Sequence, residues 1–416
     1  MADDRILEEG FNGLASAQPA LPAAWYFEPA QFDREMRDIW GKSWVYLCRA
    51  DSLPHTGDFR SFSIGGQEIL VVRGEDGAVH GFFNTCRHRG SALCTSETGR
   101  FERRIVCPYH QWTYGLDGRL LATGRMRPVA GFDRAEYGLH AIAIAEWGGC
   151  VFANLAGDGA SPFKEVFGGE LSFIASWPME TLVTGHRYRK ELACNWKIFW
   201  ENFNECLHCP NIHPELCELV PIYGRGIMAR RDDPEWQAHA DDGAPLRSGG
   251  LRTGADTWSM DGAAQDELPG LSHEERASGQ RYATLLPSVF IAAHVDYVRI
   301  VRLMPLSPER TELTAEWLFR PETLARPDFD LARITDFATL VMEQDGMACE
   351  LNQRGLRAAP FERGVLMQEE YEVFLFQDWI REALGEPRLS QPAGSRASRR
   401  RPLGTEKQSG DHHEPG

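Results

Sequence analysis

The sequence predicts an α+β protein in which a small β-domain precedes a domain of mixed helices and strands. Its 416 residues, 43% of them hydrophobic, are enough for two domains with separate cores. Residues 45–155 hold short β-branched or alternating runs between Gly and Asp turns. After about residue 160 the pattern changes to a mixture of helical and strand-like spacing. We expect four segments, which are an N-terminal helical segment over residues 1–44, the β-domain over 45–160, the mixed domain with an antiparallel sheet over 161–384, and a disordered tail over 385–416.

The first predicted helix precedes the β-domain. Phe32, Met36, Ile39 and Trp40 recur near helical spacing within residues 29–44. We expect this helix to pack on the outside of the β-domain.

In the mixed domain we expect a helix beginning at Trp196, strands within residues 298–318 and a long helix over 331–351. Residues 229–281 are rich in Asp, Gly, Arg and Ala and show weak periodicity. They predict a long, partly ordered loop over the active site. The polar C-terminal tail includes the basic run 399–401, and its composition predicts a solvated, disordered segment.

Composition excludes several classes of function. With 60 acidic and 44 basic residues, the formal charge of −16 repels nucleic acid. The N-terminus lacks the basic and then apolar pattern of an export signal, and no apolar run reaches the roughly 20 residues needed to cross a bilayer. The ten cysteines are therefore expected to be thiols or metal ligands, and the expected location is the cytoplasm.

Two short motifs in the β-domain predict a metal cluster. Cys86 and His88 form a C-x-H pair, and Cys107 and His110 form a C-x-x-H pair. Two thiolates on one iron and two imidazoles on the other are the ligand set of a Rieske [2Fe-2S] cluster. Replacing two anionic thiolates by neutral imidazoles raises the reduction potential, and such a cluster relays single electrons.

A Cys2His2 zinc site is the alternative for the same four residues. A zinc finger normally places its histidines together in one half of the motif, whereas here each half carries one Cys and one His. Each loop can then supply one ligand to each iron. The flanking residues 89–90 and 111–115 also resemble the cluster-binding loops of Rieske proteins, so the iron-sulfur interpretation is favoured.

A second group of metal-ligating residues follows in the mixed domain. His208 and His213 are five residues apart, and Pro210 cannot continue a helix, so we expect the preceding helix to end near Cys209. His213 can then fold back beside His208. With Asp345 as the third ligand, two histidines and a carboxylate form the facial triad of a mononuclear non-haem iron oxygenase, which leaves positions free for O2.

Each of these residues also has an ordinary structural interpretation. A single histidine near a helix end is usually only hydrogen-bonded, and an Asp in an amphipathic helix most often faces solvent. Their occurrence together, downstream of a cluster that delivers electrons, favours the iron site.

From about residue 25 to 384 the chain resembles the catalytic α subunits of the Rieske non-haem iron oxygenases, also called ring-hydroxylating oxygenases. The resemblance implies a Rieske β-domain followed by a helix-grip catalytic domain of the START or Bet v1-like kind, assembled as a homotrimer with head-to-tail contacts. It implies that Glu205 forms a hydrogen bond between the two metal centres across a subunit boundary. The ligands that it implies are Cys86, His88, Cys107 and His110 for the cluster, and His208, His213 and Asp345 for the mononuclear Fe(II).

One departure from the best-known aromatic-ring dioxygenases is informative, because they commonly carry Asp where this chain has Glu205. Residues 205–209, 213–216, 260–262 and 352–355 are more similar to the branch that oxidises quaternary ammonium compounds such as glycine betaine, carnitine and proline betaine. In that branch a methyl or methylene group next to nitrogen is hydroxylated, and the hemiaminal then releases an aldehyde. An aromatic-ring dioxygenase acting on an aromatic acid remains the alternative.

Aromatic side chains are the candidates for substrate recognition. A quaternary ammonium cannot donate a hydrogen bond, so it is bound by aromatic faces, each worth roughly 0.5 to 2 kcal/mol. We select Trp258, Tyr282, Phe290 and Tyr297 as candidates. The same rings suit a flat aromatic substrate or plain core packing.

The predicted function is that of a terminal oxygenase that uses O2. No Gly-rich nucleotide fingerprint follows a strand, so electrons are expected from a separate NAD(P)H-dependent flavin or iron-sulfur reductase. They would cross through His88 or His110, Glu205 and His208 to the iron. A Rieske electron carrier without catalytic iron is the rival from another class, and it would hold about two irons per chain instead of about three.

Overall fold

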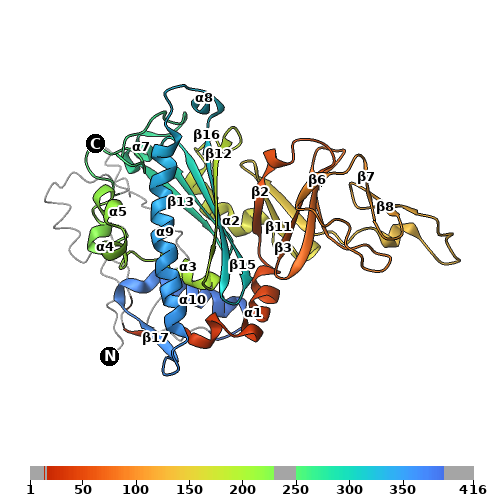
Figure 1. Cartoon of the computed structure of the whole chain (residues 1–416), viewed down its shortest axis with the longest axis horizontal. Coiled ribbons are helices and arrows are strands. Elements are labelled where there is room, and N and C mark those ends of the chain that lie inside the picture. The colour runs from red at the N-terminus through yellow and green to blue at the C-terminus, as the bar shows by residue number, and fades with distance from the viewer. Residues whose placement is uncertain (1–13, 15, 229–249, 388–416) are drawn as a thin grey trace, which may run out of the picture.

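The computed structural model describes residues 14, 16–228 and 250–387, and the chain forms two lobes (Figure 1). A β-domain extends to one side of a larger domain, which is built on a five-stranded sheet with the long helix α9 (Leu331–Leu356) along it. Among the described helices, none has both the length and the apolar content that spanning a bilayer requires.

The β-domain consists of three small antiparallel sheets with strand orders β10-β11-β2, β5-β4-β3-β6 and β7-β8-β9. Their strands are β2 (Val45–Arg49), β3 (Asp58–Ile64), β4 (Gln67–Arg73), β5 (Val79–Phe83), β6 (Thr98–Arg100), β7 (Arg104–Val106), β8 (Trp112–Gly115), β9 (Leu120–Thr123), β10 (Ala143–Trp147) and β11 (Cys150–Asn154). In β4, Ile69 and Val71 enter one apolar core while Leu70 and Val72 enter another. Both faces of this strand are covered, which explains its continuous apolar run.

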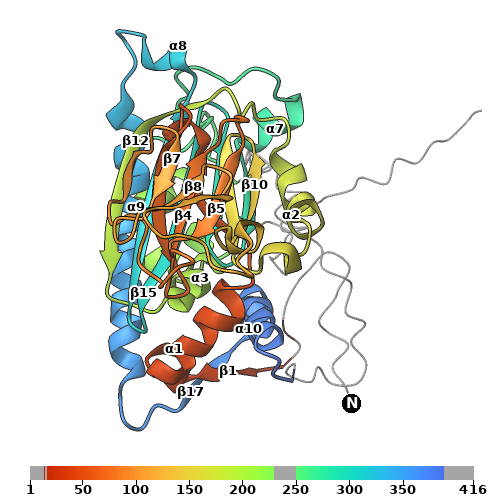
Figure 2. The same ribbon diagram turned by 90° about the vertical axis from the view of Figure 1, so that its right-hand side faces the viewer.

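The larger domain is organised by an antiparallel sheet of order β12-β16-β15-β14-β13. Its strands are β12 (Val183–Leu192), β13 (Gln280–Leu285), β14 (Val289–His294), β15 (Val298–Ser307) and β16 (Arg310–Phe319). Along β14, Val289 and Ile291 pack with α2 (Phe163–Leu171), whereas Phe290 and Ala292 share a core with residues of α3 (Trp196–Phe203) and α9. Figure 2 shows α9 and α2 on opposite sides of this sheet. The predicted α+β architecture with an antiparallel sheet and a long helix is confirmed.

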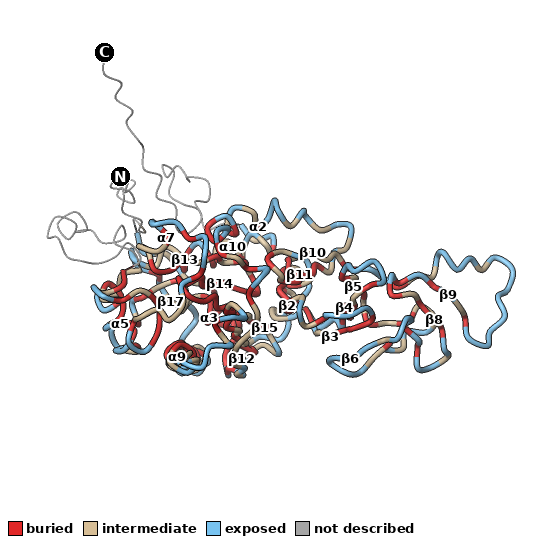
Figure 3. Tube along the Cα trace, turned by 90° about the horizontal axis from the view of Figure 1, so that it is seen from above, coloured by how far each residue is buried: buried red, intermediate tan, exposed pale blue. Residues whose placement is uncertain are grey.

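The remaining elements close the ends of the larger domain. Strand β1 (Gln18–Pro22) pairs antiparallel with β17 (Arg363–Leu366), although the two are far apart in the sequence. The other helices are α1 (Pro29–Glu35), α4 (Cys209–Ile212), α5 (Pro214–Leu219), α7 (His273–Ser278), α8 (Pro321–Leu324) and α10 (Tyr371–Ala383). Short 3-10 turns cover Ala23–Tyr26, Ala50–Ser52, Arg134–Tyr137, Gly157–Gly159, Ser172–Ile174, Tyr223–Arg225 and Gln368–Glu370. Figure 3 shows buried residues along the sheet of this domain and mostly exposed chain near β8 and β9.

The first predicted helix exists, and it packs against the β-domain on the side that faces the larger domain. It runs as α1 and continues as a π-helical stretch, Met36–Trp40. Ile39 and Trp40 are 1% and 0% exposed, and the Trp40 ring meets that of Trp196 edge to face at 5.5 Å. Apolar residues of this stretch therefore fill space between the two lobes, where both lobes exclude water from them.

Two other predictions concern segments that the structure describes only in part. Of the predicted loop 229–281, residues 229–249 lie outside the described residues. Residues 250–281 are largely irregular before β13, and Leu251, Ala255 and Trp258 pack in one apolar cluster with Cys209. Of the predicted tail, residues 388–416 lie outside the described residues.

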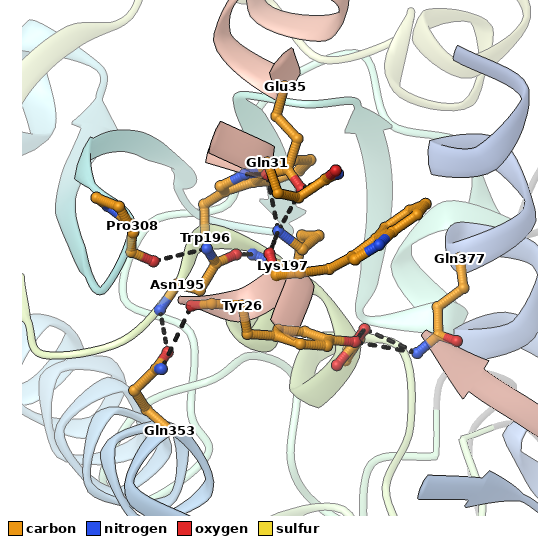
Figure 4. A network of polar contacts seen from close by, with 11 residues as sticks. Tyr26, Gln31, Glu35, Asn195, Trp196, Lys197, Pro308, Gln353 and Gln377 are labelled. Atoms are coloured by element: carbon orange, nitrogen blue, oxygen red, sulfur yellow. Dashed lines mark hydrogen bonds and ion pairs between the residues drawn. The ribbon is translucent and has the colours of Figure 1, made fainter. Parts of the chain in front are cut away.

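Helix α3 is anchored by a buried ion pair (Figure 4). Glu35 and Lys197 both have fully buried side chains, and Lys197 Nζ lies 2.7 Å from each carboxylate oxygen. Trp196 Nε1 donates to Glu35 at 2.9 Å, and Lys197 also donates to the Trp25 carbonyl at 2.9 Å. Burial lowers the pKa of Lys197, and Glu35 opposes that effect. The pair joins the N-terminal segment to the first turn of α3.

A second set of hydrogen bonds holds the far end of the same helix. Tyr26 Oη donates to Glu201 at 2.5 Å, and Gln377 Nε2 from α10 donates to the same oxygen at 2.8 Å. Burial raises the pKa of Glu201 from its ordinary value of 4.5 to about 7. Helix α3 is therefore fixed from both ends before the chain enters the segment that carries the predicted iron ligands.

We expect Lys197→Met to lower the free energy of unfolding by about 3 to 5 kcal/mol, because it leaves the Glu35 carboxylate buried without its cation. Urea denaturation followed by circular dichroism measures the change. The double variant Glu35→Gln/Lys197→Met should recover much of the loss, since it removes both charges. A loss below about 1 kcal/mol in the single variant would contradict this account.

The raised pKa of Glu201 predicts a dependence of stability on pH. Between its ordinary value of 4.5 and about 7, the folded chain holds a proton that the unfolded chain has released. Stability therefore falls as the pH rises through this window, by at most about 3 kcal/mol from this group. Denaturation curves at pH 5 and pH 8 should differ less for Glu201→Gln than for the wild-type chain. If Glu201→Gln shows the same difference in stability between pH 5 and pH 8 as the wild-type chain, groups other than Glu201 cause the pH dependence.

Candidate metal centres and substrate site

The four predicted cluster ligands lie on two neighbouring loops of the β-domain. Cys86 and His88 follow β5, and Cys107 and His110 lie between β7 and β8. The cysteines are 3% and 1% exposed, whereas both histidines are partly exposed. The Nδ1 atoms of His88 and His110 are 3.1 Å apart. The structure thus brings the two imidazoles together, with both thiols buried.

The two loops share one backbone geometry. The carbonyl of Cys86 accepts from Gly90 N–H at 3.0 Å, and the carbonyl of Cys107 accepts from Gln111 N–H at 3.0 Å. Gly90 and Gln111 both have left-handed φ angles, of 74° and 59°. Among the described residues Gln111 is the only non-glycine with a positive φ, which costs energy. Both loops turn sharply after their histidine, so each presents one Cys and one His.

The surroundings of the cluster ligands suit metal binding. The His88 ring stacks on Trp112 at 5.0 Å, and Tyr114 Oη lies 3.2 Å from Cys86 Sγ. Loss of hydration, followed by the nearby His110, lowers the pKa of His88. The imidazole is therefore neutral near pH 7, as a metal ligand must be.

The spacing of these ligands argues against a single zinc ion. Among the described residues, His208, Cys209 and His213 form the only group of three or more potential ligand atoms within 4.8 Å of one another. The quartet of the β-domain is more widely spread, whereas ligand atoms around one tetrahedral zinc lie about 3 to 4 Å apart. A cluster of two irons fits the wider set.

The predicted iron histidines lie on a short irregular segment after α3. Helix α3 ends at Phe203, which is earlier than the predicted end near Cys209. Pro210 instead lies in the first turn of the new helix α4, where its missing N–H costs nothing. His213 lies between α4 and α5, and its ring centroid is 5.1 Å from that of His208. The histidines fold side by side as predicted, but through a turn and a separate helix.

Glu205 holds this turn and orients His208. Its Oε2 atom accepts from the backbone N–H of Leu207 and, at 3.2 Å, from that of His208. Its Oε1 atom lies 2.6 Å from His208 Nδ1. A proton on Nδ1 leaves Nε2 free to bind a metal, so the carboxylate fixes the tautomer that a ligand needs.

Asp345 completes the group from helix α9. Its Oδ1 atom lies 2.9 Å from His213 Nε2 and 3.4 Å from His208 Nε2. Burial raises the pKa of Asp345, but hydrogen bonds from the two histidines outweigh it, so the pKa falls below its ordinary value. Gln344 Oε1 lies 2.8 Å from His213 Nδ1 and orients that ring. The residue pattern gave no signal for Gln344, because an exposed helix surface commonly carries glutamine.

Cys209 is a rival for the third ligand. Its Sγ atom is 3.8 Å from His208 Nε2. The thioether and thiolate ligands of proteins select softer metals, whereas Fe(II) in oxygenases is held by two histidines and a carboxylate. Asp345 Oδ1 faces the Nε2 atoms of both imidazoles, which makes it the better third ligand.

Comparisons with known proteins agree with this arrangement. Residues 43–133 match the Rieske [2Fe-2S] domain, and residues 179–386 match the ring-hydroxylating alpha subunit catalytic domain. The glycine betaine monooxygenase oxygenase subunit of Pseudomonas aeruginosa is 32% identical over 388 residues, which cover 88% of this chain and 89% of that protein. This chain belongs to the family of Rieske ring-hydroxylating oxygenase α subunits.

Other members of the family are similar over a smaller share or only in fold. The carnitine monooxygenase oxygenase subunit of Escherichia coli is 30% identical over 223 residues, covering 53% of this chain and 59% of that protein. A solved structure of the quaternary ammonium Rieske monooxygenase CntA with L-carnitine superimposes with a TM-score of 0.64 at 20% identity, covering 88% of this chain and 96% of that one. Naphthalene 1,2-dioxygenase from a Rhodococcus species gives a TM-score of 0.62 at 20% identity, covering 88% and 95%.

The cofactors of this Rieske oxygenase are therefore a [2Fe-2S] cluster and a mononuclear iron. The paired loops fit the cluster, because they combine two buried thiols with two adjacent imidazoles. The second group fits an iron, because two Nε2 atoms and one carboxylate oxygen converge.

The structure places the four aromatic candidates of this oxygenase in two separate groups. Phe290 stacks on Phe203 at 4.2 Å, and Tyr282 is 6.2 Å from the same ring. Tyr297 Oη donates to the Trp258 carbonyl at 2.9 Å. The sequence analysis missed Phe203, whose apolar pattern is that of any buried helix residue. Its position at the end of α3 places it directly before the iron-ligand segment.

We expect Asp345→Ala to reduce the iron content from about three to about two atoms per chain and to leave the visible spectrum of the cluster intact, because only the mononuclear site loses a ligand. Metal analysis and absorption spectroscopy of the purified protein measure both. Cys209→Ser is the matched control and should keep about three irons. The reverse result, with iron lost from the cysteine variant alone, would make Cys209 the ligand.

Proposed function

We propose that this chain is the terminal oxygenase that hydroxylates an N-methyl or N-methylene group of a quaternary ammonium compound of the betaine kind. The hemiaminal that results breaks its C–N bond, releasing an aldehyde and a tertiary amine. Two electrons, two protons and O2 are consumed, and one oxygen atom leaves as water. The observation that carries the proposal is the convergence of His208, His213 and Asp345 in a chain similar over 88% of its length to a glycine betaine monooxygenase subunit.

Aromatic residues close to the ligand segment support a cationic substrate. Phe203, Tyr282 and Phe290 form one contact group, and Trp258 shares an apolar cluster with Cys209. Faces of such rings attract a quaternary ammonium that cannot donate hydrogen bonds. We propose Trp258, Tyr282, Phe290 and Tyr297 as the substrate-binding set on this ground.

Each polar residue of the site has a role in this reaction. The iron, when bound, supplies the activation of O2. His208, His213 and Asp345 would hold it, and Glu205 and Gln344 orient the two imidazoles through their Nδ1 atoms. Because Glu205 touches His208 at the partly exposed end of α3, it is also the proposed bridge for electrons that arrive from a cluster.

The electron source is proposed to be a separate NAD(P)H-dependent flavin or iron-sulfur reductase, and the assembly a homotrimer. In Figure 1 the loops beside β7 and β8 lie at one end of the chain, whereas α4 and α5 lie at the opposite end, beyond the central sheet. A cluster on those loops is then better placed to serve the iron of a neighbouring subunit than that of its own chain. We further propose a cytoplasmic location, where reduced pyridine nucleotides are available.

With a surrogate reductase and NADH, we expect glycine betaine or carnitine to release an aldehyde in step with O2 consumption. The aldehyde is formaldehyde where an N-methyl group is hydroxylated, and it carries the substrate's own chain where an N-methylene group is. Aldehyde analysis by mass spectrometry after derivatisation, with an oxygen electrode, measures both. Asp345→Ala should release no aldehyde while its cluster is still reduced, which separates failed chemistry from failed electron delivery. Diol formation from aromatic acids, without an aldehyde from any quaternary ammonium compound, would replace this proposal by the aromatic-ring alternative.

A further inference from the structure

A buried group of polar atoms without partners lies on the sheet face that α3 and α9 cover. Both ring nitrogens of His294, the Nε and Nη1 atoms of Arg299 and the Nε1 atom of Trp258 have no hydrogen-bond partner among the described residues. These residues are 0%, 4% and 4% exposed. Buried polar groups in folded proteins nearly always have partners, so a group of five such atoms indicates a missing ligand.

The three side chains surround a common region. His294 ends β14 and Arg299 lies near the start of β15, where it pairs with Ala292 of the neighbouring strand. The Trp258 ring centroid is 5.8 Å from that of His294 and 6.0 Å from the Arg299 Cζ atom. On β14, Ala292 and His294 share one face of the strand, because successive side chains alternate.

In the described part of the chain, no carboxylate balances the charge of Arg299. No described acidic side chain forms an ion pair with it, and a guanidinium cannot release its proton to avoid the cost of burial. The nearest acid in sequence, Asp296, is occupied by Thr257 Oγ1 at 2.6 Å and by Gln265 N–H at 3.2 Å. Burial, followed by Arg299, lowers the pKa of His294 well below its ordinary value, so this imidazole is neutral and offers one N–H donor.

The group is close to the candidate iron site. Trp258 packs in one apolar cluster with Cys206, Cys209 and Phe337. Tyr282 lies within electrostatic range of both Arg299 and Cys209. A ligand bound at Arg299 therefore extends toward the segment that carries His208, past aromatic side chains.

We propose that Arg299 and His294 bind the carboxylate of a zwitterionic substrate, so that its ammonium end lies among the aromatic rings next to the iron. The inference rests on the proposed function and names the substrate class within it. The paired N–H groups of a guanidinium match a carboxylate in geometry and charge. Choline, which has the ammonium but no carboxylate, leaves the arginine unpaired and binds weakly.

Binding of three small molecules to the anaerobic holoenzyme without reductase tests the inference by isothermal titration calorimetry. Glycine betaine carries both charges, 3,3-dimethylbutanoate keeps the carboxylate with carbon in place of nitrogen, and choline keeps only the cation. We expect Arg299→Gln to raise the Kd of both carboxylates at least tenfold, or about the effect of one lost charged hydrogen bond. The Kd of choline should change less than about threefold. The cluster spectrum of each variant checks folding.

Two further variants keep the test decisive. Arg302→Gln is the matched control from the same strand, because Arg302 already has Glu312 at 2.8 Å, and it should not separate the carboxylates from choline. If Arg299→Gln does not fold, His294→Phe keeps the ring shape without its N–H and should weaken the carboxylates alone. Equal weakening of all three ligands, no weakening, or no binding of glycine betaine to the wild-type chain overturns the inference.

The binding test and the turnover test distinguish failure of the anion site from failure of the proposed function. Carboxylates that bind through Arg299 without release of any aldehyde would refute the proposed function and leave the anion site standing. Aldehyde release at equal efficiency from choline and glycine betaine, unaffected by Arg299→Gln, would keep the function and refute the anion site.

Discussion

The packing of helix α9 against α3 is the constraint on which the rest of the chain depends. Asp345 is contributed by α9, and His208 and His213 follow α3, yet the carboxylate and the imidazoles must meet within about one hydrogen-bond length. Helix α3 cannot shift freely, because a buried lysine in its first turn is paired with Glu35 and a partly buried carboxylate near its end accepts from two other segments. Since such buried groups are costly when unpaired, the network favours one position of the helix and therefore one geometry of the iron ligands.

The polar residues that orient the two histidines differ from Arg299 in their hydrogen bonding. Carboxylate and amide oxygens contact the Nδ1 atoms of the two histidines, which directs both Nε2 atoms toward Asp345. On the sheet, Arg299 has no such partner among the described residues. This contrast between the two groups is the basis of the proposed carboxylate site at Arg299.

The two lobes hold the two candidate metal centres far apart in one chain. The cluster loops are at the far end of the β-domain, while the iron ligands lie beyond the sheet of the larger domain (Figure 1). The cluster loops and the iron-ligand segment are separated because the sheet between them is covered on both faces. The β-domain and α2 cover one face, and α3 with α9 cover the other. This separation of the two proposed metal centres is the basis of the proposal that electrons pass between copies of the chain.

The sequence by itself predicted the order of the two domains, the cluster motif and the two candidate iron histidines, because close spacing and the chemistry of Cys and His limit what those residues can do. Asp345 lies far along the chain, and its choice as third ligand rested on the family resemblance. Rules based on local sequence predicted less well those features that depend on packing between distant segments. The end of α3 at Phe203 is set by the Glu205 carboxylate, which binds the next backbone N–H groups, and not by Pro210. Three features depend on segments that are far apart in the chain. They are the burial of Trp40, the contact of Gln344 with His213, and the lack of a hydrogen-bond partner for Arg299 among the described residues. Only the tertiary structure decided them, because hydrogen-bond partners and water exclusion depend on which segments meet, and periodicity carries no information about that.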